Sequence, residues 1–297
     1  MPQLLKPADK VAIVSPSGAV RPEYVSGMVE TLRKLGLSPV VMPSALERSG
    51  TYAGSADMRF NDMVTALLSK DIRAIFCTRG GFGAVALLQR LNRLPIREND
   101  KWLVGFSDIS ALHALWYSHR VESIHGPMGR YLSHLPVDSA PVEALKRQLF
   151  EGRDELTFDP HPLDRCGRGE GILAGGNLAV LTSLMGTPYS MLQPNTIMVI
   201  EDINEPLYKI ERMLWQLRLA GVLENLNGLI VGKFTGTEPD ANHRSVEELV
   251  AEMTAPYSYP VAYDAPIGHF EGNMPVILGS RATLVVEPAA PVTLTMN

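Results

Sequence analysis

The chain of 297 residues is longer than one small hydrophobic core needs, so we expect two domains. Hydrophobic residues make up 45% and charged residues 20%, which is typical of a folded globular protein and excludes a disordered chain. The net charge is -5 and the Lys and Arg residues are scattered, which argues against a nucleic-acid partner.

The N-terminal residues and the cysteines indicate a cytoplasmic protein. Residues 1–18 lack a long apolar core followed by a small-residue cleavage site, and no run approaches the ~20 apolar residues of a membrane span. Cys77 and Cys166 are the only cysteines and lie far apart in the chain, so we expect two reduced thiols. The expected location is therefore the cytoplasm, with no membrane partner.

Short apolar runs alternate with longer amphipathic ones through the first half of the chain. From Val25 to Leu35, apolar residues recur at every third or fourth position and Gly36 ends the run, which indicates a helix. Such alternation is typical of an α/β fold, in which helices cover both faces of a parallel sheet. The pattern predicts strands at 10–16, 38–43, 72–79, 101–106 and 121–127, and helices at 22–36, 57–71, 82–92 and 108–119.

The second half of the chain is more mixed. Residues 151–170 are polar and lack a helical period, so we interpret them as a linker between a domain at 1–150 and a domain at 171–297. Residues 171–189 read as a strand, a glycine turn and a helix. Further strands are predicted at 195–202, 226–234, 260–266 and 282–288, and a helix at 206–221 with Pro206 in its first turn.

Ser107 lies between the apolar strand 101–106 and the following helix. In open α/β sheets this position, after the carboxyl end of a strand, is where ligands bind. A serine there can act as a nucleophile, because the N–H groups of the next turn favour an oxyanion. The alternative is that Ser107 or Asp108 caps the helix, since both residue types are preferred at N-caps. The stretch by itself leaves both interpretations open.

A serine nucleophile needs a base and an orienting carboxylate. His269 follows a predicted strand and Gly268, in a loop rich in glycine and proline, which is a common place for functional residues. Glu201 closes the apolar strand 195–202, so a carboxylate projects at the edge of the core. The neighbouring Asp202 is also explained by capping of the helix that starts at Pro206. The chain contains no G-x-S-x-G, so an esterase elbow is excluded.

The glycines after strand 72–79 support a competing class of function. Gly81-x-Gly83-x-x-Ala86 matches the loose dinucleotide fingerprint, with Asp108 at roughly the position of its ribose-binding acid. The same glycines can instead let backbone N–H groups approach a peptide and hold an oxyanion. No H-E-x-x-H or C-x-x-C is present, so we predict no metal.

Taken in order, five stretches resemble those of the LD-carboxypeptidases, the S66 class of serine peptidases. The resemblance spans residues 11–286 and rests on "SPSG", "RGGFGA", "GFSDIS", "GGNLAVLTSLMGTPY" with "IEDINEPLYKIERML", and "GHFEGNMPVILG". It implies an N-terminal parallel-sheet domain like that of class I glutamine amidotransferases and a C-terminal swivelling β/β/α domain. It also implies an active site in the cleft between these domains.

The resemblance assigns a catalytic triad of Ser107, Glu201 and His269. An oxyanion hole would then comprise the N–H of Asp108 and one from the loop of Gly80 and Gly81. A free substrate carboxylate needs a clamp as well. We assign that role to Arg79, because a guanidinium binds a carboxylate with two parallel hydrogen bonds.

The implied activity is removal of the terminal D-alanine from murein tetrapeptides during cytoplasmic recycling of cell-wall fragments. The implied enzyme needs no cofactor and forms a homodimer. An alternative is hydrolysis of peptide-nucleotide antibiotics of the microcin C type, a branch whose chains tend to be longer than 297 residues. More distant alternatives are an NAD(P)-dependent oxidoreductase and a non-catalytic binding protein.

Overall fold

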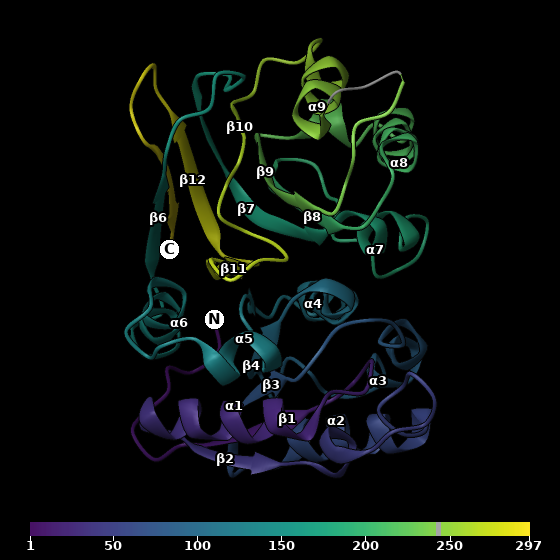
Figure 1. Ribbon diagram of the computed structural model, residues 1–297, viewed down its shortest axis with the longest axis vertical. Coiled ribbons are helices and arrows are strands. Elements are labelled where there is room, and N and C mark those ends of the chain that lie inside the picture. Colours follow the sequence, from purple (N-terminus) through teal and green to yellow (C-terminus); the bar gives the residue numbers. More distant parts are fainter. Residues whose placement is uncertain (242–244) are drawn as a thin grey trace. The chain divides into compact units, whose positions relative to one another are not determined.

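The computed structural model describes residues 1–241 and 245–297, and within these residues the chain divides into two compact units. Unit 1 comprises Met1–Arg153 and Met274–Leu278, and unit 2 comprises Asp154–Asn273 and Gly279–Asn297. Each unit has its own sheet and helices (Figure 1). No helix in the described part of the chain is both long and apolar enough to cross a membrane.

The sheet of unit 1 has the strand order β11-β5-β4-β3-β1-β2. Strands β1 to β5 are parallel, and β11 joins β5 antiparallel. Almost every residue of β1, β3, β4 and β5 is buried, as expected for strands covered on both faces. The strands are β1 (Lys10–Val14), β2 (Ser38–Val41), β3 (Ile72–Cys77), β4 (Trp102–Gly105), β5 (Ser123–His125) and β11 (Val276–Leu278).

The strand order places the loops after β1 and β3 side by side. β1 feeds β2 on one side and β3 lies on its other side, so the order reverses between β1 and β3. Ligands of open α/β sheets bind at the carboxyl ends of the strands at such a point. The loop after β1 carries "SPSG" and the loop after β3 carries "RGGFG", so both motifs lie at this position.

In unit 1, α1 packs against α5, and α3 packs against both α2 and α4 (Figure 1). Buried residues Val25, Met28 and Leu32 lie on one face of α1, which confirms the apolar period. The helices are α1 (Pro22–Lys34), α2 (Ala56–Leu68), α3 (Leu88–Leu91), α4 (Ser110–Ser118), α5 (Gly129–His134) and α6 (Ala140–Glu151), with 3-10 turns η1 (Pro43–Leu46), η2 (Val85–Leu87) and η3 (Ser107–Ile109).

The helix predicted at 82–92 is much shorter than expected. Gly81 and Gly83 have φ of +97° and +123°, a backbone region that a right-handed helix cannot use, so only η2 and α3 follow. These glycines therefore form an irregular loop of their own.

The sheet of unit 2 is mixed, with the order β10-β9-β8-β7-β12-β13-β6. β7 to β10 are parallel, whereas β12, β13 and β6 continue the sheet as antiparallel neighbours. Helices α7, α8 and α9 lie together beside the parallel strands (Figure 1). The strands are β6 (Asp154–Phe158), β7 (Gly167–Asn177), β8 (Thr196–Ile203), β9 (Gly228–Thr235), β10 (Val261–Ala262), β12 (Arg281–Val286) and β13 (Val292–Met296), and the helices are α7 (Leu178–Ser183), α8 (Leu207–Leu219), α9 (Val246–Thr254) and the 3-10 turn η4 (Leu223–Asn225).

Two expectations for unit 2 need revision. The stretch 151–170 contains β6 and the start of β7, because its alternating residues add an edge to the antiparallel part of the sheet. The glycines at 175 and 176 belong to β7 rather than to a turn. A Cβ on Gly175 would lie 2.0 Å from the carbonyl oxygen of Val199, so the glycine is what lets β7 approach β8.

Candidate active site

Ser107 lies on a sharp turn at the carboxyl end of β4. The preceding Phe106 is extended, and Ser107 then takes φ of +66°, a left-handed conformation that is uncommon for residues other than glycine. Its side chain is half-buried, whereas Phe106 and Asp108 on either side are buried. The turn therefore presents this hydroxyl where its neighbours are covered, at the cost of local backbone strain.

The helix-cap interpretation of Ser107 and Asp108 is wrong. Phe106 occupies the N-cap of η3 and Ile109 that of α4, and in the described part of the chain no side chain caps either one. The carboxylate of Asp108 instead accepts hydrogen bonds from the hydroxyl of Ser17 and the N–H of Ala84. Its own N–H lies in the first turn of η3, where backbone N–H groups have no acceptor inside the helix.

The glycine loop after β3 packs directly against the serine. A Cβ on Gly80 would lie 2.7 Å from Cβ and 2.8 Å from Oγ of Ser107, and 3.0 Å from the nitrogen of Asp108. Only a glycine leaves room for this approach. The next residue, Gly81, has φ of +97° and is exposed. Unit 1 thus brings Ser107, Asp108, Gly80 and Gly81 into one cluster.

Arg79 adjoins this cluster with its side chain exposed. One guanidinium nitrogen, Nη1, donates to the carbonyl oxygen of Ala19 at 2.7 Å. A guanidinium has five N–H donors in a planar fork, so this single bond leaves capacity for a carboxylate.

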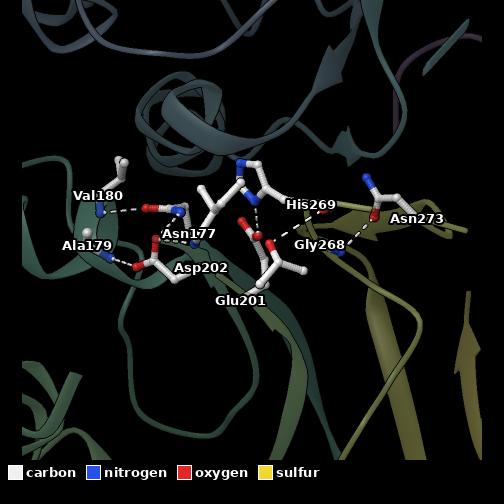
Figure 2. Close-up of polar contacts among 10 residues, drawn as sticks. Asn177, Ala179, Val180, Glu201, Asp202, Gly268, His269 and Asn273 are labelled. Carbon is white, nitrogen blue, oxygen red and sulfur yellow. Dashed lines mark hydrogen bonds and ion pairs between the residues drawn. The ribbon is translucent and has the colours of Figure 1, made fainter. Parts of the chain in front are cut away.

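In unit 2, Glu201 and His269 form a hydrogen-bonded pair (Figure 2). Oε2 of Glu201 lies 2.6 Å from Nδ1 of His269. The carboxylate side chain is fully buried, and the imidazole is 10% exposed. Because a carboxylate accepts, Nδ1 carries the proton and Nε2 becomes the basic nitrogen of the ring.

The loop around His269 is shaped by two residues that the motif analysis did not single out. The N–H of Gly268 donates to Oδ1 of the fully buried Asn273 (Figure 2). The hydroxyl of Thr235 donates to the carbonyl oxygen of His269. Gly268 has φ of +134°, and a Cβ there would lie 3.2 Å from Oε2 of Glu201. The sequence offers no local signal for Asn273, which follows Glu271 and Gly272 in the same loop.

Asp202 serves a different helix from the one expected. Its carboxylate accepts from the N–H of Ala179 at the start of α7 and from Nδ2 of Asn177, whereas α8 begins after Pro206 with no side-chain cap within the described residues (Figure 2). Burial raises the pKa of Asp202 to about 6, although these hydrogen bonds act in the opposite direction. Asp202 therefore anchors the end of β8 next to Glu201.

The glycine loop does not have the form of a dinucleotide site. A pyrophosphate site needs a helix opened by the loop, but here only η2 and the four-residue α3 follow. Asp108 is buried and bonded to the loop itself, so it is not placed as a ribose ligand. Among residues 1–241 and 245–297, no three His, Cys, Asp or Glu side chains are grouped to hold a metal ion.

Comparison with known families identifies the chain. A family model described as the LD-carboxypeptidase N-terminal domain matches residues 11–126, and one described as the LD-carboxypeptidase C-terminal domain matches residues 170–284. The chain belongs to the LD-carboxypeptidase family. As a member of this peptidase family, it is a serine-type carboxypeptidase.

This LD-carboxypeptidase is 32% identical to the murein tetrapeptide carboxypeptidase of Pseudomonas aeruginosa, over 95% of this chain and 95% of the relative. The solved muramoyltetrapeptide carboxypeptidase from Oxalobacter formigenes superposes with a TM-score of 0.88 at 23% identity, covering 97% of this chain and 98% of the other. The microcin C7 self immunity protein also gives a TM-score of 0.88, at 20% identity, covering 100% and 98%. The two structural likenesses show that the fold is shared.

Proposed function

We propose that this LD-carboxypeptidase removes the terminal D-alanine from murein tetrapeptides, with Ser107 as nucleophile, His269 as general base and Glu201 as the residue that orients the base. The observation that carries the proposal is the Glu201–His269 pair. A buried carboxylate that holds Nδ1 of a partly exposed imidazole makes Nε2 available to take a proton, which is the task of the base in a serine peptidase.

Chain connectivity supports a reaction shared between residues of the two units. In unit 1, Val276 of β11 pairs with His125, and His125 pairs with Gly105 at the end of β4. His269 precedes Val276 by seven residues, a stretch that spans at most about 25 Å when fully extended. The histidine loop is thus covalently tied to the sheet that carries the serine.

In the proposed reaction, Oγ of Ser107 attacks the scissile carbonyl while His269 takes the hydroxyl proton. The imidazolium then protonates the leaving D-alanine nitrogen, and water hydrolyses the acyl-enzyme by the same route. The N–H of Asp108 and one from the Gly80–Gly81 loop stabilise the oxyanion, and loss of such a donor typically costs ~2.7 to 4 kcal/mol of barrier. Arg79 binds the free carboxylate of the substrate.

Sequence similarity favours murein tetrapeptide over a microcin-type substrate. Among the curated relatives, the chain is 32% identical to a murein tetrapeptide carboxypeptidase and 30% identical to a probable murein peptide carboxypeptidase. The microcin-type likeness is to solved structures and shows the fold alone. The same proposal includes a cytoplasmic location and a homodimer. The free thiols of Cys77 and Cys166 are compatible with a reducing compartment, and light scattering of the purified protein measures the oligomeric state.

The test is hydrolysis of a purified murein tetrapeptide, with D-alanine measured as the product. We expect turnover by the wild-type enzyme and loss of at least ~1,000-fold in kcat for Ser107→Ala with an unchanged circular dichroism spectrum. A folded Ser107→Ala enzyme with wild-type turnover would contradict the nucleophile. A peptide-nucleotide cleaved faster than the tetrapeptide would contradict the substrate.

A further inference from the structure

The carboxylate of Asp108 joins the two loops that flank Ser107. Its Oδ2 accepts from the hydroxyl of Ser17 at 2.6 Å and from the N–H of Ala84 at 2.9 Å. Asp108 is 6% exposed and Ser17 is fully buried, so water does not compete for these bonds. One side chain therefore fastens the loop after β1 and the loop after β3 to the turn of the nucleophile.

Arg59 holds the same two loops at the neighbouring residues. Its Nη1 donates to the carbonyl oxygen of Pro16 at 2.7 Å and to that of Gly83 at 3.0 Å, and the side chain is buried. Pro16 precedes Ser17, and Gly83 precedes Ala84. The guanidinium of Arg59 thus holds the carbonyl oxygens of Pro16 and Gly83. The carboxylate of Asp108 holds the donors of the residues that follow them, Ser17 and Ala84.

The two loops determine where the backbone lies beside the serine. The N–H of Gly18 donates to the carbonyl oxygen of Gly80 at 3.0 Å, and Gly80 is in close contact with Ser107 and the nitrogen of Asp108. A shift of either loop would therefore move the glycine backbone relative to Oγ of Ser107. Charge stabilisation of this kind requires donors placed within tenths of an ångström.

We propose that Asp108, together with Ser17 and Arg59, is a positioning residue that sets the oxyanion-binding backbone around Ser107. Its side chain acts on the reaction through the loops and does not touch substrate. This inference rests on the proposed function, in which Ser107 is the nucleophile. We call the hydrogen bonds of Asp108, Ser17 and Arg59 to the two loops the brace. Because the oxyanion exists only in the transition state and the tetrahedral intermediate, the brace acts on kcat rather than on substrate affinity.

The test compares Ser17→Ala and Asp108→Asn with Asp62→Asn. Asp62 is a matched control, since it is also a buried carboxylate of unit 1 and accepts a backbone N–H, that of Ser44 at 2.6 Å. We expect Ser17→Ala and Asp108→Asn each to lower kcat by ~10- to 100-fold with KM changed by less than about threefold. Asp62→Asn should lower thermal stability and leave kcat within about twofold.

Two further measurements separate positioning from general destabilisation. A fluorophosphonate reacts when Oγ of Ser107 displaces its fluoride, so the labelling rate reports the nucleophile and its oxyanion donors without peptide binding. We expect this rate to fall in parallel with kcat. The kcat of the double variant of Ser17→Ala and Asp108→Asn should lie within about threefold of the kcat of the slower single variant, because both substitutions break the same hydrogen bond.

A folded Ser17→Ala enzyme with wild-type kcat and labelling rate would overturn the brace while leaving Ser107 as nucleophile. So would a rise in KM at constant kcat. An active Ser107→Ala enzyme would instead show that the proposed function has failed. Should Asp108→Asn not fold, Ser17→Ala and Arg59→Lys carry the test, and the same loss of kcat is expected of both.

Discussion

Gly268 directly precedes His269, the proposed general base, and its lack of a side chain is a requirement of the Glu201–His269 pair. Its φ is +134°, and a Cβ would lie 3.0 Å from the carbonyl oxygen of Lys233 and 3.2 Å from Oε2 of Glu201. The first contact is to backbone that cannot move cheaply. The second is to the atom that binds His269.

We therefore predict that Gly268→Ala lowers the free energy of unfolding by about 1–3 kcal/mol and displaces the Glu201–His269 pair, lowering kcat by more than ~10-fold. Gly186→Ala is the matched control in unit 2, because Gly186 has φ of +78° with open space around it. It should cost stability on the order of 1 kcal/mol and leave kcat unchanged. Denaturant unfolding and kcat are measured for both variants. Equal kcat values for Gly268→Ala and Gly186→Ala would contradict the requirement for a glycine beside the Glu201–His269 pair.

The local sequence makes Ser107, Glu201 and His269 candidates, since they lie at strand ends or behind a glycine, but it leaves Ser107 open as a helix cap. The resemblance of five separated motifs assigns the three as a triad. The sequence did not predict the left-handed φ of Ser107, since no residue-level preference favours serine there. Nor did it predict Asn273, or the bonds of Asp108 to Ser17 and Ala84. These depend on residues up to 91 positions apart in the chain.

Next to the turn that carries Ser107, a buried histidine joins β4, α4 and β5. Nε2 of His113 donates to the carbonyl oxygen of Gly105, the last residue of β4, and Nδ1 accepts from the hydroxyl of Ser123 in β5. Burial lowers the pKa of His113 to about 3, and the nearby His125 acts in the same direction. The imidazole is therefore neutral at physiological pH and stays so well into the acid range.

The lowered pKa of His113 makes the free energy of unfolding depend on pH with a defined sign. The unfolded chain binds a proton at His113 with pKa of about 6.5, whereas the folded chain does so only near 3. Between these values the unfolded state binds more protons, so stability is fully present above pH 6.5 and falls as the pH drops. Asp202, whose pKa is raised, contributes the opposite slope between about 3.8 and 6.

We predict that, between pH 6.5 and 4, the free energy of unfolding falls less in His113→Gln than in wild type, by on the order of a few kcal/mol. Urea unfolding at both pH values measures the difference, and comparison with wild type cancels the part due to Asp202. Parallel slopes for the two proteins would contradict a neutral buried imidazole.

At the level of elements, the parallel strands of unit 1 were predictable because full burial gives continuous apolar runs. The edge strands β6 and β11 were not. β6 is polar on its exposed face, and β11 is only three residues long and pairs with a strand more than 140 positions earlier in the chain. Pairing over such distances leaves no local pattern.

For the whole molecule, the division into two units was expected from length, and a boundary does fall within 151–170. The return of Met274–Leu278 to unit 1 was not expected, because the chain simply crosses back after the histidine loop. This return is the covalent link between the histidine of one unit and the sheet of the serine in the other. It supports the proposal that both units contribute to one reaction.

The central claim is that Ser107 and His269 act as one catalytic unit although they belong to different compact units. The most direct measurement is kcat for D-alanine release from murein tetrapeptide by Ser107→Ala, His269→Ala and the double variant, all shown to be folded. Residues that act together are non-additive, so the double variant should be no slower than either single variant, within about threefold. Losses that multiply in the double variant would show that the two residues act independently, and would contradict the account.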